Sequence, residues 1–250
     1  MNKISIGLII PTKNAETTLD IVLRLLCNSP VEFYCLIIDS SSDDQTVSIA
    51  KEHHAKVIII PQSEFNHGAT REYARKQLAT DIVVYLTQDA IPASADLIAN
   101  LVKPLIEQDE VVVSYGRQVA HEGADLFEAF PREYNYAERE QVRGIEDVDQ
   151  YGVYTFFCSN SCAAYKNAAL DEIGGFKSVL TNEDYFAVAD LLQKGYKIAY
   201  AADAVVKHSH SYSLWQEFQR YFDTGYVRAE NPIIQQLVGQ AESRGVGFVA

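Results

Sequence analysis

Hydrophobic and polar residues alternate along the first half of the chain in blocks whose lengths match strands and helices. Short apolar runs predict buried strands, and longer segments with apolar residues every three or four positions predict amphipathic helices. The expected strands are "ISIGLII", "FYCLIID", "KVIII", "DIVVYLT" and "VVVSYG". The expected helices between them are "AETTLDIVLRLLCN", "DDQTVSIAKEHH", "ATREYARKQLA" and roughly residues 93–108. Continuous apolar strands separated by such helices predict an α/β fold with a parallel sheet covered on both faces.

The pattern is weaker in the second half of the chain. Residues 117–151 are charged and rich in tyrosine, which predicts an excursion of helix and loop over the sheet edge. The elements expected after it are the ordered segment "VYTFFCSNSCAAYKNAALDEIGGF", a helix at "NEDYFAVADLLQKG", a strand pair through "YKIAYAADAVVKH" and a final helix from "SLWQEFQRYFDTG". No repeat or low-complexity linker divides the chain, so we expect a single domain over residues 1–250.

Composition and charge exclude several classes of partner. Hydrophobic residues make up 48% of the 250 residues and charged residues 22%, which is typical of a globular protein. The formal net charge of −13 argues against nucleic acid as a partner and against adhesion to anionic lipid by charge alone. The four cysteines form no C-x-x-C pair, and we expect them to be reduced and in or near the core of a cytosolic protein. No apolar run is long enough to be a signal sequence or a membrane span, which predicts a soluble protein, at most peripheral to a membrane.

Polar residues follow the first four expected strands. They are residues 11–14 ("PTKN"), 39–43 ("DSSSD"), 61–68 ("PQSEFNHG") and 87–89 ("TQD"). Each segment alone is explained by turn or cap chemistry. Because the carboxyl ends of parallel strands share one edge of the sheet, the four together predict a ligand site. The G-x-G-x-x-G and G-x-x-x-x-G-K-[ST] motifs are missing, which argues against a dinucleotide dehydrogenase and a P-loop NTPase.

Five segments of the sequence, four of which include these polar residues, together resemble glycosyltransferase family 2, and in particular its rhamnosyltransferase-like branch. They are "LIIPTKNAETTLDIVL", "IIDSSSDDQT", "SEFNHGATRE", "VYLTQDAIP" and "TNEDYFAVADLLQKGYKIAY". The first two mark the glycosyltransferase-A fold generally, whereas "FNHGATR" with "TQDA" is more specific to that branch. The resemblance spans Ile4 to Phe222. It implies a glycosyltransferase-A domain with a nucleotide-sugar-binding half (1–116) and an acceptor-binding half with the C-terminal helix (117–250).

The resemblance also implies an activity. It is the inverting, metal-dependent transfer of a sugar from a nucleoside-diphosphate donor, with dTDP-L-rhamnose as the expected donor. The expected acceptor is a saccharide or lipid-linked saccharide of bacterial surface polysaccharide synthesis, met at the cytoplasmic face of the membrane. By resemblance, Asp39 accepts a hydrogen bond from the pyrimidine N–H, and other donor-binding residues line the base, ribose and phosphates. The donor-binding candidates are Pro11, Thr12, Asn14, Asp39, His67, Arg71, Thr87 and Gln88.

Several of these donor-binding candidates have an alternative interpretation. Asp39 is also placed to cap the next helix, although Asp43 and Asp44 are better placed for that task. The alternative for His67 is a loop residue and for Arg71 a solvated helix residue, and the resemblance favours donor binding over both.

A metal site is expected around Asp89. This residue resembles the last aspartate of the family's D-x-D motif, and Thr87 stands where the first aspartate usually is. One carboxylate supplies few of the ligands that Mg²⁺ or Mn²⁺ needs, so a further ligand is expected from His208 or His210. The pattern does not choose between these two histidines. Imidazole suits Mn²⁺ better than Mg²⁺. The alternatives are a helix cap for Asp89 and a structural histidine pair.

The expected catalytic base lies at the start of a helix. By resemblance, Asp184 deprotonates the acceptor hydroxyl, and Glu183 positions the acceptor or the base. Adjacent side chains do not face the same way, so the two carboxylates should have different tasks. Asn160 is a candidate for the floor of the acceptor pocket. The alternative for the Glu–Asp pair is charge that favours the first turn of the helix.

Two other functions are compatible with the same fold. A sugar nucleotidyltransferase would need a glycine-rich and basic loop after the first strand, which "PTKNAETT" lacks. A non-catalytic sugar-nucleotide-binding subunit is suggested by Thr87 in place of an aspartate. In the final helix, the apolar stripe of Leu214, Trp215, Phe218, Tyr221 and Phe222 either faces the core or borders an acceptor lipid or a partner.

Overall fold

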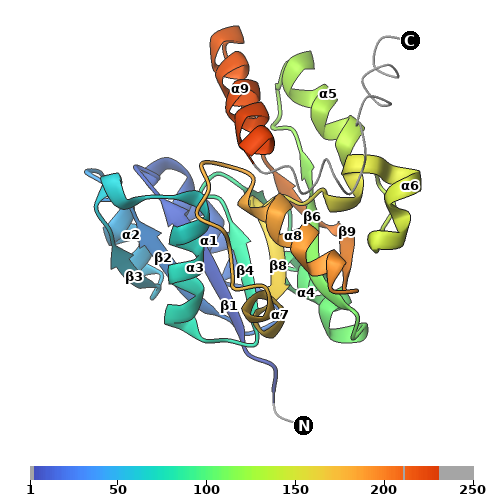
Figure 1. Cartoon of the computed structure of the whole chain (residues 1–250). Coiled ribbons are helices and arrows are strands. Elements are labelled where there is room, and N and C mark those ends of the chain that lie inside the picture. Colours follow the sequence, from blue (N-terminus) through green and yellow to red (C-terminus); the bar gives the residue numbers. More distant parts are fainter. Residues whose placement is uncertain (1–2, 211, 231–250) are drawn as a thin grey trace.

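The apolar runs of the sequence lie side by side in one mixed sheet at the centre of the molecule (Figure 1). The structure is a computed structural model and describes residues 3–210 and 212–230. The strand order is β3-β2-β1-β4-β8-β6-β9-β5, and β7 pairs with β9 outside this path. The strands are β1 (Ile6–Thr12), β2 (Tyr34–Asp39), β3 (Lys56–Ile59), β4 (Ile82–Leu86), β5 (Ile91–Pro92), β6 (Val111–Val119), β7 (Gln141–Arg143), β8 (Cys162–Lys166) and β9 (Lys197–Lys207).

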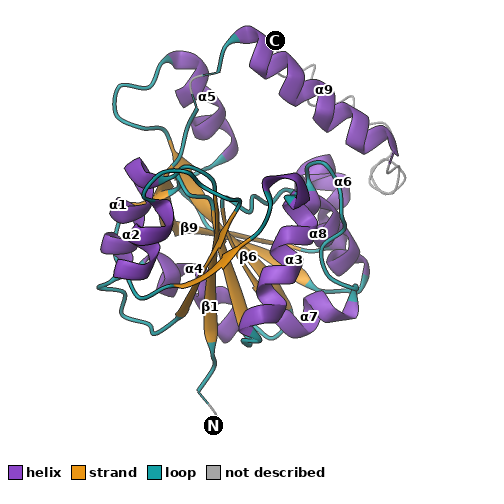
Figure 2. Ribbon diagram, turned by 90° about the vertical axis from the view of Figure 1, so that its left-hand side faces the viewer, coloured by secondary structure: helices purple, strands orange, loops and turns teal. Residues whose placement is uncertain are grey.

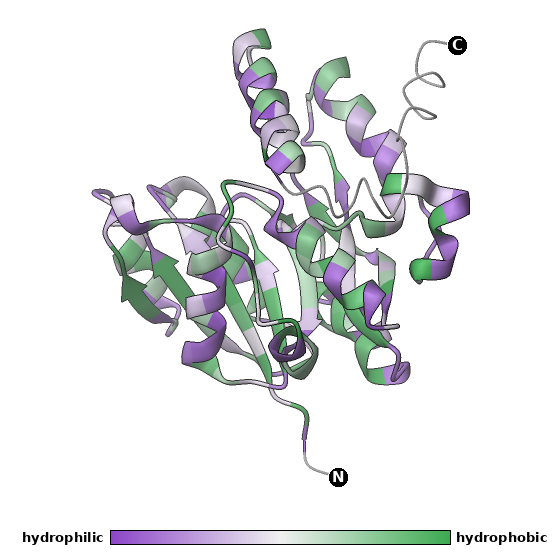
Figure 3. Cartoon of the chain, in the orientation of Figure 1, coloured by the Kyte–Doolittle hydropathy of each residue, from purple (hydrophilic) through white to green (hydrophobic). Residues whose placement is uncertain are grey.

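Helices cover both faces of this sheet. Helices α1, α2 and α4 lie on one face, and α3, α7 and α8 lie on the other (Figure 2). Each face has its own cluster of buried apolar side chains, and apolar residues gather on the strands between them (Figure 3). The α-helices are α1 (Glu16–Leu26), α2 (Thr46–Glu52), α3 (His67–Leu78), α4 (Leu97–Glu107), α5 (Leu126–Asn135), α6 (Val148–Tyr151), α7 (Asn167–Glu172), α8 (Glu183–Gln193) and α9 (Leu214–Glu230). Short 3₁₀ helices are η1 (Gln62–Glu64), η2 (Ile145–Asp147) and η3 (Gly152–Phe156).

The parallel half of the sheet confirms the expectation from the apolar pattern. Strand β1 pairs in parallel with β2 and β4, and β2 pairs in parallel with β3. The register places Thr12 beside Asp39, so the polar residues that follow these strands meet at one edge of the sheet. All five residues of β4 are buried, as its uninterrupted apolar sequence predicts for a central strand.

The second half of the sheet differs from the sequence prediction in two ways. Strand β8 enters between β4 and β6 and is antiparallel to both, so the sheet is mixed rather than parallel throughout. The strand pair expected at "YKIAYAADAVVKH" is wrong, because β9 is one strand of eleven residues. Its register against β6 shifts between Gly116 and Arg117, where a side chain on Gly116 would collide with the carbonyl of Ala204. The break expected between two strands is therefore a bulge within one strand.

Helices α5 and α9 project from the edge of the sheet that carries the polar loops (Figures 1 and 2). The region from 117 to 151 contains helix and loop, as expected, with the short strand β7 in addition. Along the described residues, none of the helices combines the length and the apolar character that crossing a bilayer requires.

All four cysteines are free, which agrees with the expectation of reduced thiols. Cys158 and Cys162 are buried and Cys35 is partly buried. Cys27 is exposed, so its expected place in or near the core is wrong. It follows the last residue of α1, where the buried face of the helix has ended at Leu26.

Candidate active site

The polar residues at the ends of β1 and β2 and after β4 are joined to one another by hydrogen bonds. Asp39 is fully buried, and its carboxylate accepts hydrogen bonds from the Thr12 hydroxyl (2.9 Å) and the Ser42 hydroxyl (2.6 Å). The Gln88 side chain accepts from the backbone N–H of Lys13 (2.8 Å) and donates to its carbonyl (3.1 Å). These contacts join three loops into one rigid rim at the sheet edge.

A cavity of about 260 Å³ opens at this rim. Three predicted donor-binding residues, Pro11, Thr12 and Gln88, are among its lining residues. Two others, Gln62 and Phe65, were not predicted from the sequence, although Phe65 stands out as the only aromatic residue in the loop after β3. An aromatic ring and amide groups around a narrow cavity suit a planar heterocycle.

Asn14 and Asp39 belong to the same rim but do not line the cavity. Asn14 has a positive φ of 50°, and its side chain accepts a hydrogen bond from the backbone N–H of Asp43 (3.0 Å). Asp39 uses both carboxylate oxygens within the rim, because the second accepts from the backbone N–H of Ser42 (2.8 Å). Donor contact by either residue stays a prediction.

Asp89, His208 and His210 converge on one point at the end of β4. Their ligand atoms all lie within 4.8 Å of one another. One Asp89 oxygen is 3.4 Å from Nε2 of His208, and the other is 3.6 Å from Nδ1 of His210. The structure therefore brings both histidines to Asp89, where the sequence did not choose between them.

The surroundings of this cluster suit a divalent cation. The Nδ1 atom of His208 is 2.9 Å from the side-chain oxygen of Gln118, and a proton shared there leaves Nε2 free as a ligand. Burial alone would raise the pKa of Asp89, but the hydrogen bond and charge of His208, together with the Thr87 hydroxyl and His210, hold that pKa well below its usual range. Burial and the charge of His208 also lower the pKa of His210, which favours the neutral imidazole that binds metals. The three residues thus fit a transition-metal site of one carboxylate and two imidazoles.

A second and larger cavity, of about 550 Å³, contains both histidines of this cluster. Asp184 lines it from the start of α8, and Ser159 and Ser161 line it from the loop before β8. Helices α5 and α9 contribute further lining residues, Arg132, Asn135, Arg220 and Tyr221. Of these, the sequence pattern singled out Tyr221 alone, as part of the apolar stripe of the final helix. Their helices are far apart in the sequence, and no local motif marks which of their side chains face the cavity.

The two carboxylates at the start of α8 face different surroundings, as expected. Asp184 lines the large cavity, and its oxygens accept hydrogen bonds from the backbone N–H groups of Asn160 (2.9 Å) and Tyr185 (2.8 Å). Burial and the negative charge of Glu183 raise the pKa of Asp184 to about 7. Asn182, just before the helix, has a positive φ of 64°, a strained conformation that fixes how the chain enters α8.

Glu183 points instead into the protein, where it meets Arg71. The two side chains are 6% and 4% exposed, and the distance from Arg71 Nη1 to Glu183 Oε1 is 3.1 Å. Burial would raise the pKa of Glu183, but the charge of Arg71 and a hydrogen bond from Asn160 lower it overall. Asn160 is itself buried beneath the cavity, so its expected acceptor contact stays a prediction. Burial and the charge of Arg71 lower the pKa of the neighbouring His67.

Known proteins resemble this chain in sequence and in fold. The model of the family described as "Glycosyl transferase family 2" matches residues 8–174. The chain is 40% identical, over 98% of its length and 79% of theirs, to the O-antigen chain rhamnosyltransferases RfbN of Salmonella typhimurium and WbaN of Salmonella anatum. Among solved structures, it is similar to the mannosyltransferase PcManGT of Pyrobaculum calidifontis in complex with GDP-Man and Mn²⁺, with a TM-score of 0.68 at 18% identity, over 95% of this chain and 69% of that one. It is equally similar to residues 1–349 of S. aureus TarS with UDP-GlcNAc, with a TM-score of 0.68 at 16% identity, over 98% of this chain and 73% of that one.

Proposed function

The chain belongs to glycosyl transferase family 2, and from this premise we propose that it transfers an L-rhamnosyl group from dTDP-L-rhamnose to a saccharide of a bacterial surface polysaccharide. One observation of the geometry carries the proposal. The carboxylate of Asp184 faces the same cavity as the two histidines of the Asp89 cluster, so a base and a cation site meet in one place. The names of the 40% identical relatives support rhamnose and O-antigen as the sugar and the product class.

The donor occupies the first half of the chain in this proposal. The base and ribose lie in the 260 Å³ cavity, beside Thr12, Phe65 and Gln88. The buried Asp39 stabilises the rim of this cavity through its hydrogen bond with Thr12. Any contact of the pyrimidine with Asp39 is made at that rim. Residues 1–116 thus form the donor half, and 117–250 form the acceptor half. The sugar and diphosphate extend toward Asp89, where the two halves meet.

Asp89, His208 and His210 are the residues that would hold Mn²⁺ or Mg²⁺, and their two imidazoles favour Mn²⁺. A bound cation supplies positive charge that stabilises the departing diphosphate. Arg132 and Arg220 line the same cavity and add positive charge near these ligands from α5 and α9. The protein thereby gathers cationic groups in a chain whose net charge is −13.

Asp184 is the proposed base. Its carboxylate accepts the proton of the acceptor hydroxyl, and that oxygen attacks the anomeric carbon on the side opposite the leaving diphosphate. A single base is enough for this inverting reaction, because no covalent sugar–enzyme intermediate has to be resolved. A pKa of about 7 matches the operating pH, which is the condition under which a general base is most effective.

The acceptor lies in the 550 Å³ cavity between α5, α9 and the start of α8. Tyr154, Tyr212 and Tyr221 line it, and aromatic rings there suit the apolar faces of sugar rings. We place the protein in the cytoplasm, at the inner face of the cell membrane, where a lipid-linked saccharide is within reach.

The test uses purified protein, Mn²⁺, radiolabelled dTDP-L-rhamnose and a membrane fraction that contains lipid-linked saccharides. Label is expected to move into the lipid-extractable fraction with the wild type and not with Asp184→Asn. Labelled UDP-glucose and GDP-mannose serve as donor controls. Transfer from one of these in preference to dTDP-L-rhamnose contradicts the donor assignment. Tight donor binding without any transfer would favour the non-catalytic binding subunit.

A further inference from the structure

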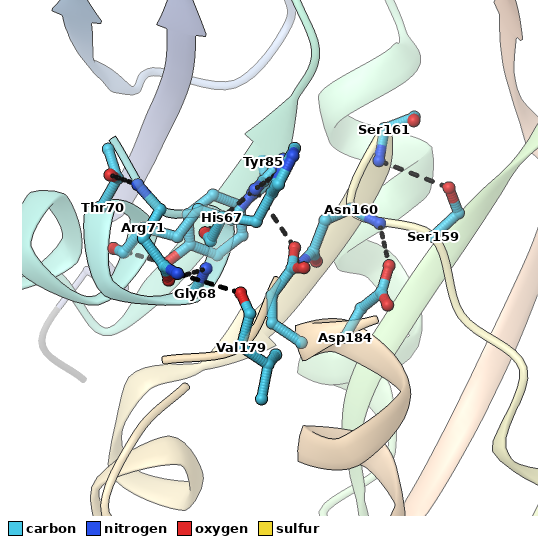
Figure 4. A network of polar contacts seen from close by, with 12 residues as sticks. His67, Gly68, Thr70, Arg71, Tyr85, Ser159, Asn160, Ser161, Val179 and Asp184 are labelled. Carbon is cyan, nitrogen blue, oxygen red and sulfur yellow. Dashed lines mark hydrogen bonds and ion pairs between the residues drawn. The ribbon is translucent and has the colours of Figure 1, made fainter. Parts of the chain in front are cut away.

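The start of α3 is packed against the chain that leads into α8. The Asn66 side chain donates to the carbonyl of Val179 (3.0 Å), and it also caps α3 by accepting from the backbone N–H groups of Gly68 and Ala69. A side chain on Gly68 would place its Cβ 1.9 Å from the carbonyl oxygen of Lys177. Glycine is therefore required for this close approach. Figure 4 shows Gly68 and Arg71 of α3 together with Val179 of the chain that leads into α8.

Arg71 lies one turn further along α3 and completes the same contact. Its Nη1 atom makes the ion pair with Glu183 and donates to the carbonyl of His67 (3.0 Å). The Tyr85 hydroxyl donates to the Arg71 carbonyl (3.2 Å), which anchors this turn of α3 to the sheet. With 4% of its side chain exposed, Arg71 presents its charge to Glu183 and not to the donor cavity.

Asn160 connects the two carboxylates of α8. Its side-chain N–H donates to Glu183 (2.9 Å), and its backbone N–H donates to Asp184 (2.9 Å). Its side-chain oxygen accepts from the Tyr165 hydroxyl (2.8 Å). A continuous set of contacts thus leads from Arg71 through Glu183 and Asn160 to Asp184.

We propose that Arg71 is a positioning residue for the base: its guanidinium neutralises Glu183 and, with Asn66 and Gly68, holds the start of α8 so that Asp184 faces the acceptor. The proposal rests on the proposed function, because it takes Asp184 as the base. It differs from the direct donor contact that the family resemblance implies for Arg71. A buried carboxylate beside the base and without a cation would be costly, so the two charges of the pair are needed together.

The charges around Asp184 follow from this arrangement. Glu183 raises the pKa of Asp184, and Arg71 and the backbone N–H groups of Asn160 and Tyr185 lower it. The Cys158 thiol and the Tyr165 phenol also lie within electrostatic reach of Asp184, and burial raises the pKa of both. Among the described residues, Arg71 and Glu183 are thus the charged groups that shift the pKa of Asp184, and His208, His210, Arg132 and Arg220 line the cavity that it faces.

The first experiment measures binding of dTDP with Mn²⁺ by calorimetry. Arg71→Met should keep the Kd within about threefold of the wild type but lower turnover at least about tenfold, as expected for a group that acts through the base. Arg75→Met is the matched control, since Arg75 is a buried arginine on the same helix that pairs with Glu72 and Asp171. It should cost stability without lowering turnover to the same extent. A tenfold loss of dTDP affinity in Arg71→Met overturns the proposal.

The second experiment follows the acid limb of the kcat/KM profile with pH. Glu183→Gln removes the anion and leaves the cation, so the limb should move down by about one pH unit or more. The double variant Arg71→Met/Glu183→Gln should lie between Glu183→Gln and the wild type, and its turnover should exceed that of Arg71→Met, because no unpaired carboxylate remains. Limbs that coincide in all three proteins, or a double variant as slow as Arg71→Met, contradict the proposal.

A third measurement separates this inference from the proposed function, because it needs no substrate. The protonation of Asp184 is followed through the pH dependence of the free energy of unfolding, with Asp184→Asn as the reference in each background. The midpoint of that dependence should move down in Glu183→Gln. If it moves while no rhamnose is transferred, the proposed function fails and the effect of the pair on Asp184 stands. If rhamnose is transferred and the midpoint does not move, the inference fails alone.

Discussion

Asp184 and Asp89 are acidic residues of the same site, yet their environments push their pKa values in opposite directions. Burial and Glu183 raise the pKa of Asp184 to about 7. His208, Thr87 and His210 hold the pKa of Asp89 well below its usual range despite burial. A carboxyl group that titrates near neutral pH suits proton transfer, and one that stays ionised suits a cation. This divergence supports one base and one metal ligand.

Replacement of Asp184 by asparagine tests the role of the base. Asp184→Asn should lower turnover by at least about 10², because it removes the proton acceptor and leaves donor binding in place. The Kd for dTDP with Mn²⁺ should stay within a few-fold of the wild type. Turnover would be measured as rhamnose transfer and affinity by calorimetry. Near-normal turnover in Asp184→Asn combined with an inactive Glu183→Gln would show that the two roles are exchanged.

The raised pKa of Asp184 also predicts how stability depends on pH. An aspartate in the unfolded chain titrates near 3.9, so between about pH 4 and pH 7 the folded protein binds a proton that the unfolded chain does not. Stability from this group is fully present below the unfolded pKa and is lost as pH rises through about 7. Relative to Asp184→Asn, the wild type should lose about 1 kcal/mol of unfolding free energy per pH unit from about pH 5 to pH 7, and little more above pH 8. Urea unfolding at a series of pH values measures it, and parallel curves would contradict it.

Asp89 should control the response to divalent cations. Asp89→Ala removes the single carboxylate of the cluster, so Mn²⁺ should no longer strengthen dTDP binding, while the fold is kept. Asp96→Ala is a suitable control, because Asp96 is an exposed aspartate at the start of α4 whose side chain makes no capping hydrogen bond. Calorimetric titration of dTDP with and without Mn²⁺ gives the answer. An unchanged effect of Mn²⁺ in Asp89→Ala would exclude this metal site.

The contact between α3 and the chain that leads into α8 depends on the absence of a side chain at Gly68. Gly68→Ala places a methyl group against the carbonyl of Lys177, which the backbone relieves only by moving the two segments apart. We expect a loss of about 1–3 kcal/mol of unfolding free energy from this overpacking, together with lower turnover. Gly225→Ala in α9 is the control, because nothing lies within 4 Å of the added methyl group, and helix propensity makes it neutral or stabilising by up to about 1 kcal/mol. Equal stability of the two variants would contradict the packing argument.

The order of helices and strands could be predicted where each element has its own periodic signal. Strand β4 and helices α1 and α4 are examples, because the strand is apolar throughout and each of the two helices has one apolar face. The direction of β8 could not be predicted, since its alanines are buried on both faces and pair equally well either way. The bulge in β9 depends on Gly116 of a distant strand and leaves no local mark.

The candidate site shows the same division between local and distant signals. Asp39, Asp89 and Asp184 stand at or near the ends or starts of elements, where the sequence pattern and the family resemblance together select them. Arg132 and Arg220 belong to helices whose placement over the cavity depends on the whole fold. The pairing of Arg71 with Glu183 likewise joins residues more than a hundred positions apart, which a single sequence does not relate.

At the scale of the whole molecule, α9 presents an apolar surface beside the proposed acceptor cavity. Trp215 and Phe218 stack with a centroid distance of 5.4 Å, and Phe222 continues the row one turn later. They are 65%, 56% and 62% exposed, so within the described residues this stripe does not face the core. Tyr221 of the same helix lines the proposed acceptor cavity, so the stripe lies beside that cavity. We therefore expect this surface to contact lipid.

Vesicle binding tests this expectation. The double variant Trp215→Ala/Phe222→Ala should bind phosphatidylcholine vesicles at least about fivefold more weakly, because two interfacial aromatic anchors are lost. Its unfolding free energy should change by less than about 1 kcal/mol, since both side chains are exposed. Because the net charge is −13, anionic lipid should not strengthen binding, and salt should have little effect. Tyr34→Ala is the control, an equally exposed aromatic residue on β2, away from α9. Unchanged binding with a large loss of stability in the double variant would show instead that the stripe packs within the protein.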